Sequence, residues 1–210
     1  MTIEQDAAEL LSYPELQKFL RDYRDQIDTG DIVEVYKTAI PFLHKNTWTR
    51  FMDLLLMARI NPLEGATEIP GGFFGGSDLE RGLIPEGITN IGKGAFSLTE
   101  IKVLITPSSL EKLEEKALGD MYRLEQVDLS QSKIKLIPNF CFSSDDKLTF
   151  IRLPKTLTEI GYEAFDKCTA LRRIYYPGTI SEWNQIDKNT FMETYKAKVQ
   201  CSDGICEVKI

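Results

Sequence analysis

Apolar positions repeat at an almost constant interval from residue 66 onward. One set of aliphatic positions, separated by steps of 22, 22, 24 and 23 residues, comprises Ile69, Ile91, Leu113, Ile137 and Ile160. A second set lies five residues further on, follows the same steps and comprises Phe74, Phe96, Leu118, Phe142 and Phe165. A period of about 20–29 residues with one short β-type phrase per unit predicts a leucine-rich-repeat solenoid, here of about five coils.

Each coil also carries one strand-like phrase of the form L-x-x-I-x-I-P. The five copies, complete or degraded, are LERGLIP, IKVLITP, LEQVDLS, LTFIRLP and LRRIYYP, beginning at Leu79, Ile101, Leu124, Leu148 and Leu171. Alternate residues of a strand point to opposite faces, so the Leu and the two Ile positions are predicted to point inward. Proline cannot donate to a ladder and ends the strand. Stacked coils then bury a continuous apolar ladder that no coil can bury alone.

The positions between these inward residues predict two columns on one parallel-sheet face. The first column is Arg81, Val103, Gln126, Phe150 and Arg173. The second column is Leu83, Ile105, Asp128, Arg152 and Tyr175. Arginine and aromatic residues are enriched at binding hot spots, and contiguous exposed apolar patches mark interaction sites. We therefore predict that these ten residues bind a partner protein.

Within this surface the preferred contact site is the corner formed by Phe150, Arg152, Arg173 and Tyr175. The alternative is that N-terminal helices fold across the first two coils and bury Leu83, Val103 and Ile105. That alternative would make the apolar outward residues ordinary internal packing and leave only the corner for a partner.

Residues 1–64 have helical rather than strand-like spacing. We expect three helices, within YPELQKFLRDYRDQI, DIVEVYKTAIPFLHK and NTWTRFMDLLLMARI, and a short additional helix at residues 3–11. Pro14 suits the first turn of the first of these helices. Because the ends of a solenoid expose apolar core, the helical segment is predicted to cap the front of the solenoid at residues 65–196.

The chain ends in AKVQCSDGICEVKI, which predicts a β-hairpin at residues 197–210 that closes the back of the stack. Asp203 and Gly204 form a strong signal for a two-residue turn. With that turn, three pairs face each other on one apolar side: Cys201 with Cys206, Val199 with Val208, and Ala197 with Ile210. The overall prediction is an α+β chain with a helical cap, a solenoid and a hairpin cap.

The repeats IPEGITNIGKGAF and LPKTLTEIGYEAFDKCTALRRI resemble the BspA-like leucine-rich repeats, over about residues 66–206. The tail IYYPGTISEWNQI and the following CSDGI are similar to common endings of such arrays. The resemblance implies a parallel-sheet solenoid that binds proteins or surfaces and catalyses no reaction. Two stretches depart from the pattern, residues 105–130 and the variant SKIKLIPNFCF, and we expect distorted coils there.

The helical start, ending in INPL and running into IPGGFF, also resembles short repeat proteins carried by bacteriophages. This second resemblance implies that the partner is a host factor, bound and altered in the host cytoplasm. The alternative function is a structural or adhesion component of a particle or of a self-assembled homo-oligomer.

Charge and hydropathy narrow the partner class. The 210 residues carry a net charge of −7, which argues against a nucleic-acid partner and favours a protein with a basic surface. No stretch approaches the roughly 18 apolar residues that span a bilayer. The N-terminus lacks a basic region followed by an apolar core, so we expect neither a secretion signal nor a membrane partner, and a cytoplasmic location.

Few residues in the chain offer catalytic or metal-binding chemistry. The four cysteines form no CxxC pair and the single histidine is His44, so neither structural zinc nor a charge-relay set is expected. Cys168 is predicted to lie in the core, GGFFGG to form turns around the Phe ladder, and the pairs Glu114-Glu115 and Asp145-Asp146 to be solvated corners. The facing Cys201 and Cys206 leave a disulfide open, with reduced thiols favoured. We predict no cofactor and no enzymatic activity.

Overall fold

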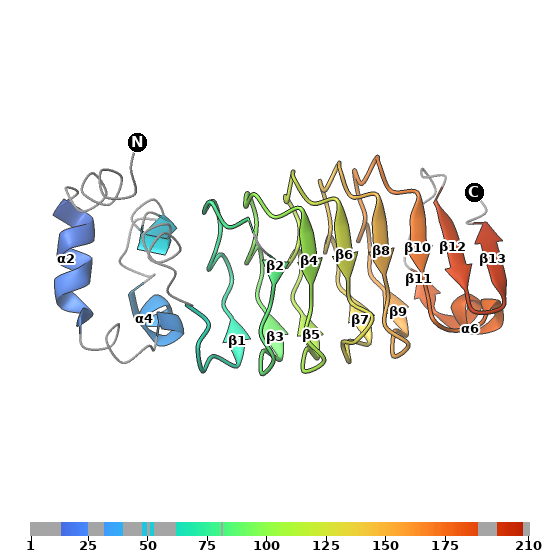
Figure 1. Cartoon of the computed structure of the whole chain (residues 1–210), viewed down its shortest axis with the longest axis horizontal. Coiled ribbons are helices and arrows are strands. Elements are labelled where there is room, and N and C mark those ends of the chain that lie inside the picture. Colours follow the sequence, from blue (N-terminus) through green and yellow to red (C-terminus); the bar gives the residue numbers. More distant parts are fainter. Residues whose placement is uncertain are drawn as a thin grey trace.

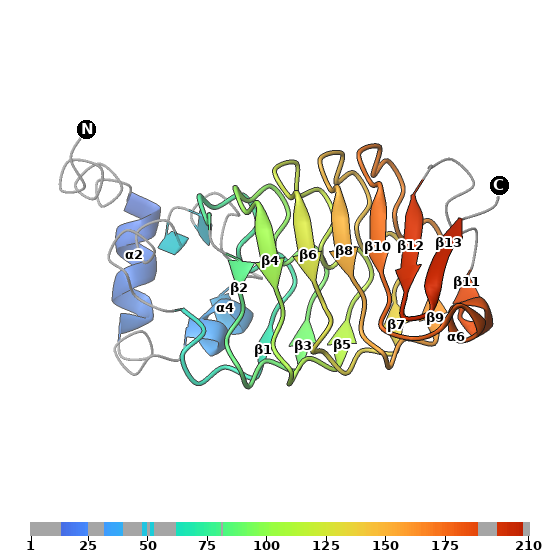
Figure 2. The same ribbon diagram turned by 45° about the vertical axis from the view of Figure 1, so that its right-hand side comes forward.

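The structure, a computed structural model, describes residues 14–24, 32–39, 48–49, 51–52, 62–80, 82–188 and 197–207. The molecule is an elongated stack of coils with helices at one end and a hairpin at the other (Figures 1 and 2). Each regular coil contributes one strand to each of two parallel sheets. The predicted solenoid, its helical cap and its C-terminal hairpin are confirmed.

The main sheet contains seven strands in the order β13-β12-β10-β8-β6-β4-β2. Their bounds are β2 Gly82–Leu83, β4 Val103–Ile105, β6 Gln126–Asp128, β8 Phe150–Arg152, β10 Arg173–Tyr175, β12 Lys198–Cys201 and β13 Gly204–Glu207. All neighbours pair in parallel except β12 and β13. The central residues Leu104, Val127, Ile151 and Ile174 are buried, which confirms the predicted alternation.

The second sheet is divided into two halves. The first half comprises β1 Glu68–Ile69, β3 Asn90–Ile91 and β5 Lys112–Leu113. The second half comprises β7 Leu136–Ile137, β9 Glu159–Ile160 and β11 Asp187–Lys188. The sheet is therefore interrupted between β5 and β7, while the main sheet runs past the same step without a break.

Pro138 accounts for one of the backbone bonds missing at this interruption. In the regular steps, the residue after each strand's last aliphatic donates its N–H to the preceding coil. These bonds are Gly92 N to Ile69 O at 2.7 Å, Glu114 N to Ile91 O at 2.9 Å and Gly161 N to Ile137 O at 2.7 Å. Pro138 occupies the equivalent position and has no N–H, so it cannot donate to Leu113. The break lies between the two stretches for which distortion is predicted, since β5 belongs to residues 105–130 and β7 to SKIKLIPNFCF. Toward the preceding coil, β5 and β6 of the first stretch keep their register.

The interior is a pair of stacked apolar ladders. The ladder that begins at Ile69 is at most 4% exposed along its five members, and the ladder that begins at Phe74 at most 3%. Phe142 and Phe165 stack with centroids 5.2 Å apart and an interplanar angle of 11°. Leu118 takes the aromatic position in its coil and is fully buried. Each such side chain contributes about 1.5–3 kcal/mol by leaving water.

Each of the five coils between Gly72 and Lys167 passes twice through left-handed backbone. The first column of positive φ is Gly72, Gly94, Lys116, Phe140 and Glu163. The second column is Gly76, Leu98, Asp120, Ser144 and Lys167. All seven non-glycine residues with positive φ in the described chain belong to these columns. The stacked turns impose this conformation even on non-glycine residues, for which it costs about 1–2 kcal/mol of conformational free energy per residue. The predicted turns of GGFFGG contain the first member of both columns.

The N-terminal cap contains α2, Pro14–Asp22, and α4, Ile32–Ala39, with further helical residues at 48–49 and 51–52. Pro14 begins α2, as predicted. The predicted helix at 3–11, most of the third predicted helix, and His44 lie outside the described residues.

The cap is joined to the first coil by side chains that donate to backbone carbonyls. These are Trp48 Nε1 to Phe73 at 2.7 Å, Thr49 Oγ1 to Gly75 at 3.1 Å and Tyr36 Oη to Gly71. An ion pair between Lys37 and Glu68 adds to them. The described helical residues thus cover the open end of the apolar stack, around the Phe73 ring.

The hairpin register differs from the prediction by two residues. Cys201 lies opposite Gly204 and Val199 opposite Cys206, so the turn residues are Ser202 and Asp203. The predicted pairing of Cys201 with Cys206 is wrong. Because the shift is even, Ala197, Val199 and Cys201 still face inward and are buried. The predicted partners Val208 and Ile210 lie outside the described residues.

Contacts with the preceding helix account for this register. Ser202 N donates to Gly178 O at 2.9 Å, and the Asp203 carboxylate accepts from Ile180 N at 2.8 Å. Ile180 is the first residue of α6, Ile180–Gln185, whose start carries a capping box between Thr179 and Glu182. The turn is therefore positioned by α6 rather than by the preference of Asp-Gly alone.

Candidate functional site

The strand register brings the predicted face residues together. The first column runs Val103, Gln126, Phe150, Arg173 and then Lys198. The second column runs Leu83, Ile105, Asp128, Arg152, Tyr175 and then Gln200. We call these eleven residues the sheet face. Nine of the ten predicted residues belong to it, and the tenth, Arg81, lies outside the described residues. The structure thus confirms the predicted alignment of these nine, while their role in binding stays a prediction.

One end of the sheet face is apolar and open. Leu83 is 74% exposed, and Val103 and Ile105 are each 45% exposed. The described helical residues donate hydrogen bonds to the first coil at Gly71, Phe73 and Gly75. With these exposures, the described part of the helical segment does not bury this end of the face.

The other end of the face is built around Phe150. The Arg152 guanidinium carbon lies 5.0 Å from the centroid of the Phe150 ring, and that of Arg173 lies 5.9 Å away. Arg152 Nη1 also donates to Asp128 Oδ2 at 3.0 Å. A guanidinium above an aromatic ring is attracted by the ring quadrupole, which favours this arrangement of the corner in the unbound protein. The structure therefore brings Phe150, Arg152 and Arg173 into contact.

Asp128 is held as a carboxylate. Partial burial works to raise its pKa, but hydrogen bonds from Ser130 and Arg152, with the Arg152 charge, outweigh it and place the pKa below its ordinary value. Because the folded-state pKa is depressed, the pair stabilises the fold above about pH 3.8, the ordinary value. That contribution is lost as the pH falls through the lower, folded-state pKa.

The hairpin extends the sheet face beyond the predicted residues. Lys198 continues the first column, and Gln200 continues the second. Ile205, opposite Gln200 on β13, is 56% exposed. Sequence reasoning treated the hairpin as a cap and missed this extension. The signal is present in the sequence, because Lys198 and Gln200 alternate with the apolar Ala197, Val199 and Cys201.

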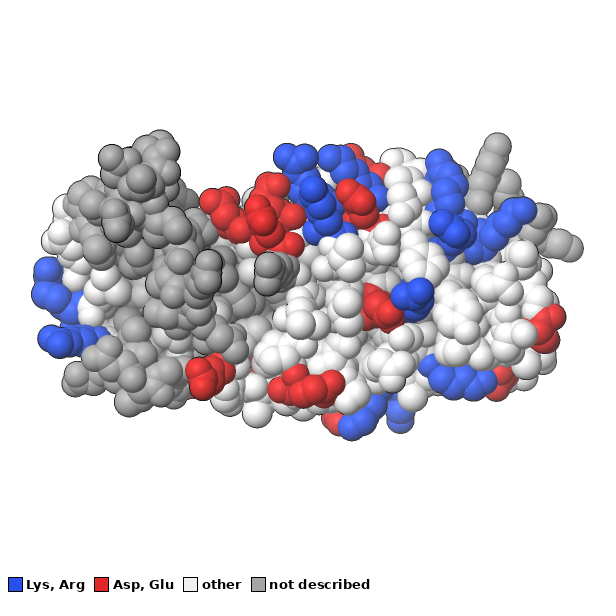
Figure 3. Space-filling view, viewed as in Figure 1, with Lys and Arg blue, Asp and Glu red and all other residues white. Residues whose placement is uncertain are grey.

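Charged side chains gather at the margins of the surface. In the view of Figure 3, Lys, Arg, Asp and Glu lie mainly along the upper and lower edges, and the area over the middle of the stack is largely uncharged. Along the sheet face the charged residues are Asp128, Arg152, Arg173 and Lys198. A face with three cations and one anion therefore stands on a chain whose net charge is −7.

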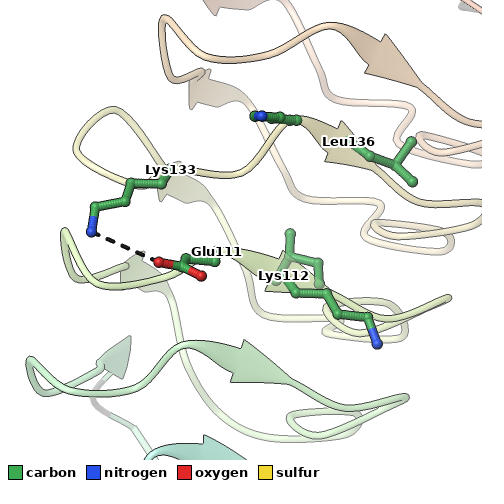
Figure 4. A pocket seen from close by; sticks show the side chains of 6 residues that line it. Glu111, Lys112, Lys133 and Leu136 are labelled. Carbon is green, nitrogen blue, oxygen red and sulfur yellow. Dashed lines mark ion pairs between the residues drawn. The ribbon is translucent and has the colours of Figure 1, made fainter.

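A groove of about 490 Å³ opens where the second sheet is interrupted. Figure 4 draws the six side chains that line it: Glu111, Lys112, Leu113, Lys133, Lys135 and Leu136. Glu111 and Lys133 form an ion pair across it at 3.8 Å. Three lysines and one glutamate thus supply the charged groups of its lining.

Asp145 is a buried acid that sequence reasoning misplaced as a solvated corner. It is fully buried, three residues after Phe142, at the position that Ser77, Thr99, Met121 and Cys168 take in the other coils. Its Oδ1 accepts from Met121 N at 2.7 Å, and its Oδ2 has no partner. Burial raises the pKa of this carboxyl well above its ordinary value. Burial therefore disfavours the ionised form of this carboxyl, which serves as a structural hydrogen-bond acceptor.

The interior cysteines are not poised for reaction. Cys168 is fully buried, as predicted, and its Sγ donates to Phe142 O at 3.1 Å. Burial raises the pKa of both Cys141 and Cys168 thiols above their ordinary value. Since the thiolate is the reactive form, neither is an activated nucleophile. Within the described part of the chain, no group of three or more His, Cys, Asp or Glu side chains is arranged to hold a metal ion.

The described helices are all short or polar. None in that part of the chain has the length and apolarity that a bilayer crossing requires.

Comparisons with known proteins place the repeats in a family. The family model described as BspA type leucine rich repeat region matches six copies over residues 67–198. A leucine-rich cell surface protein of Faecalibacterium prausnitzii A2-165 is a similar solved structure, at 19% identity and a TM-score of 0.31, covering 59% of this chain and 55% of that chain. A leucine-rich repeat protein of Bacteroides ovatus gives 19% identity, a TM-score of 0.32, and coverages of 65% and 47%.

The chain thus spans about half the length of each of these two solved structures. A comparison with curated proteins finds no significant match.

Proposed function

Because the chain belongs to the BspA-type leucine-rich repeat family, we propose that it is a non-enzymatic binding module that engages a partner protein through its sheet face. The observation that carries this proposal is the in-register alignment of Leu83, Val103 and Ile105 with the Phe150–Arg152–Arg173 corner. Large apolar side chains that are exposed to water on the sheet are unfavourably solvated. A partner that covers them removes this surface from water, which favours binding.

The corner around Phe150 is the proposed centre of the contact. Tyr175, beside Arg152 in register, is 36% exposed and completes a group of two aromatic and two guanidinium side chains. Aromatic side chains offer a large apolar area at a small cost in conformational entropy, and the guanidinium groups add several hydrogen-bond donors. The rest of the sheet face then serves mainly as complementary surface.

The finer proposal names a host protein in the host cytoplasm as the partner. It is supported by the resemblance of the helical start to phage repeat proteins. Neither a nucleic acid nor a membrane is proposed as the partner, because the chain has a net charge of −7 and the sheet face carries only three cations beside one anion.

Affinity capture from a bacterial host lysate tests this function. Wild-type protein should retain a partner that a Phe150→Ala/Arg152→Glu variant loses. A Lys112→Glu variant changes an exposed residue of the second sheet and should retain it. Equal retention by all three proteins would exclude the sheet face as the contact surface.

The alternative, a self-assembling structural component, is favoured by the hairpin edge. β13 is the last strand of the seven-stranded sheet, and an edge strand is a template for pairing with another chain. Size-exclusion chromatography with light scattering separates the two functions. A monomer or dimer supports the binding module, and a large regular assembly supports the structural component.

A further inference from the structure

The two ends of the sheet face differ in a way that specifies the partner. The described outward residues of β2 and β4 are all aliphatic and carry no charge. The outward residues of β8, β10 and β12 include two arginines and one lysine. A partner that covers both ends must therefore be apolar at one end and complementary to cations at the other.

Arg173 is the cation that a partner would neutralise. Arg152 is already bonded to Asp128 at 3.0 Å, so its charge is largely compensated. Arg173 forms no ion pair within the described chain, and its recorded side-chain contact is the face of the Phe150 ring at 5.9 Å. A guanidinium stacked on a ring keeps its donor edge free, and that edge matches a carboxylate in bidentate geometry.

The spacing of the two ends follows from the sheet. Neighbouring strands lie about 4.8 Å apart, so three steps from β10 to β4 and four steps to β2 span about 14–19 Å. A single protein segment of modest length covers that distance. Its apolar side chains would rest on Leu83, Val103 and Ile105, which are at least 45% exposed.

We propose that the sheet face binds a protein segment carrying an Asp or Glu side chain, seated on Arg173, about 14–19 Å from a group of apolar side chains seated on β2 and β4. This inference rests on the proposed function and gives the partner's chemistry. It replaces the basic partner expected from the net charge of −7, because the charge next to the contact decides complementarity more than the distant, screened charge does.

Selection from a displayed library of random 16-residue peptides tests the proposal. Binders to the immobilised wild-type protein should share apolar residues followed or preceded by an acidic residue. A synthetic binder should lose about tenfold or more in affinity for an Arg173→Glu variant. It should regain affinity for that variant when its acidic residue is changed to Lys. Fluorescence anisotropy measures each affinity.

An Arg123→Glu variant is the matched control. It changes the net charge by the same amount, but Arg123 lies off the sheet face, where it pairs with Glu100 at 3.1 Å. A Val103→Asp variant tests the apolar end and should also weaken binding.

Failure of this inference and failure of the proposed function give different results. Binders that respond to Phe150→Ala but contain no acidic residue, or that lose no more affinity for Arg173→Glu than for Arg123→Glu, would overturn the acidic partner alone. A library that yields no binder sensitive to any of the sheet-face variants would overturn both.

Discussion

The two sheets of the stack are built by the same coils, yet one is continuous and the other is not. The main sheet keeps its parallel register from β2 to β12. The second sheet stops at β5 and resumes at β7, where Pro138 withholds one backbone donor. Both sheets rest on the same buried ladders, so the core does not require both to be regular. The continuous sheet is the one that carries the sheet face.

The interrupted step has a compensating interaction. Asp145 of the later coil accepts from Met121 N of the earlier coil at 2.7 Å, inside the same step that lacks the Pro138 bond. In the coils that contain Phe74 and Phe96, the side chain at this position instead bonds within its own coil. The Ser77 hydroxyl donates to Phe74 O, and the Thr99 hydroxyl donates to Phe96 O. The Asp145 carboxyl thus supplies one hydrogen bond between two coils that are not paired in the second sheet.

The largest expected effect comes from the core that both sheets share. Phe142→Ala removes a fully buried ring that stacks on Phe165 and should destabilise the protein by about 3–5 kcal/mol. Urea unfolding followed by circular dichroism measures the loss. Phe150→Ala, on the sheet face, is the control and should change stability by less than about 1 kcal/mol. Similar losses for both would mean that Phe150 belongs to the core.

Asp145→Ala should act on the interrupted step and destabilise the protein by about 1–3 kcal/mol, because Met121 N would be left buried without an acceptor. Thermal and urea unfolding measure it. A change below about 0.5 kcal/mol would show that the bond contributes nothing to the step.

The same residue gives a pH dependence. The folded-state pKa of Asp145 lies well above 3.8, so as the pH rises the unfolded chain releases this proton first. Stability should therefore fall by up to about 1.4 kcal/mol per pH unit from pH 4 upward, until the folded carboxyl ionises. Asp145→Asn should remove this contribution, so the difference between the two stability profiles should grow with pH. Parallel profiles would contradict a folded-state pKa of Asp145 above its ordinary value.

Leu98→Gly should stabilise the protein by about 1 kcal/mol. Leu98 has φ of 63° and is 47% exposed, so glycine relieves backbone strain at little loss of packing. Gly76→Ala, at the equivalent place in the preceding coil with φ of 79°, is the matched control and should destabilise by a similar amount. If both substitutions moved stability in the same direction, the strain would not be the deciding effect.

The smallest effect is expected for Pro138→Ala, which restores the missing donor. Its new N–H can bond to Leu113 O, but the unfolded chain gains freedom, so stability should change by less than about 1 kcal/mol. Hydrogen exchange is the sharper measurement. The new amide should be protected as Gly161 is, which donates to Ile137 at 2.7 Å. A freely exchanging amide would show that the sheet is interrupted for another reason.

The face was predictable because it depends on local alternation. Residues two apart, such as Val103 and Ile105, share a side of a strand, and a constant period then stacks them in register. The hairpin register was not predictable in this way. Hydrogen bonds to Gly178 and Ile180, more than twenty residues earlier in the chain, determine that the turn forms at Ser202 and Asp203. Turn preference is a small free energy that such contacts override.

The two columns of residues with positive φ could be predicted only in part from the sequence. Gly72 and Gly94 mark the first column in the sequence, but Lys116, Phe140 and Glu163 give no sign of it. Asp145 was similarly hidden, because an acidic residue beside Asp146 suggests solvent, while its place in the repeat puts it inside. In both cases the position within the coil outweighs the preference of the residue type.

The missing bond at Pro138 also bears on how the molecule would respond to force. Each coil pairs only with its neighbours, so a force applied along the long axis acts on every coil–coil interface in series. The link between β5 and β7 has one sheet where the others have two, so pulling on the two ends should part the stack there first. A single-molecule stretching trace would then record two unequal extensions, one for each half, rather than one rupture.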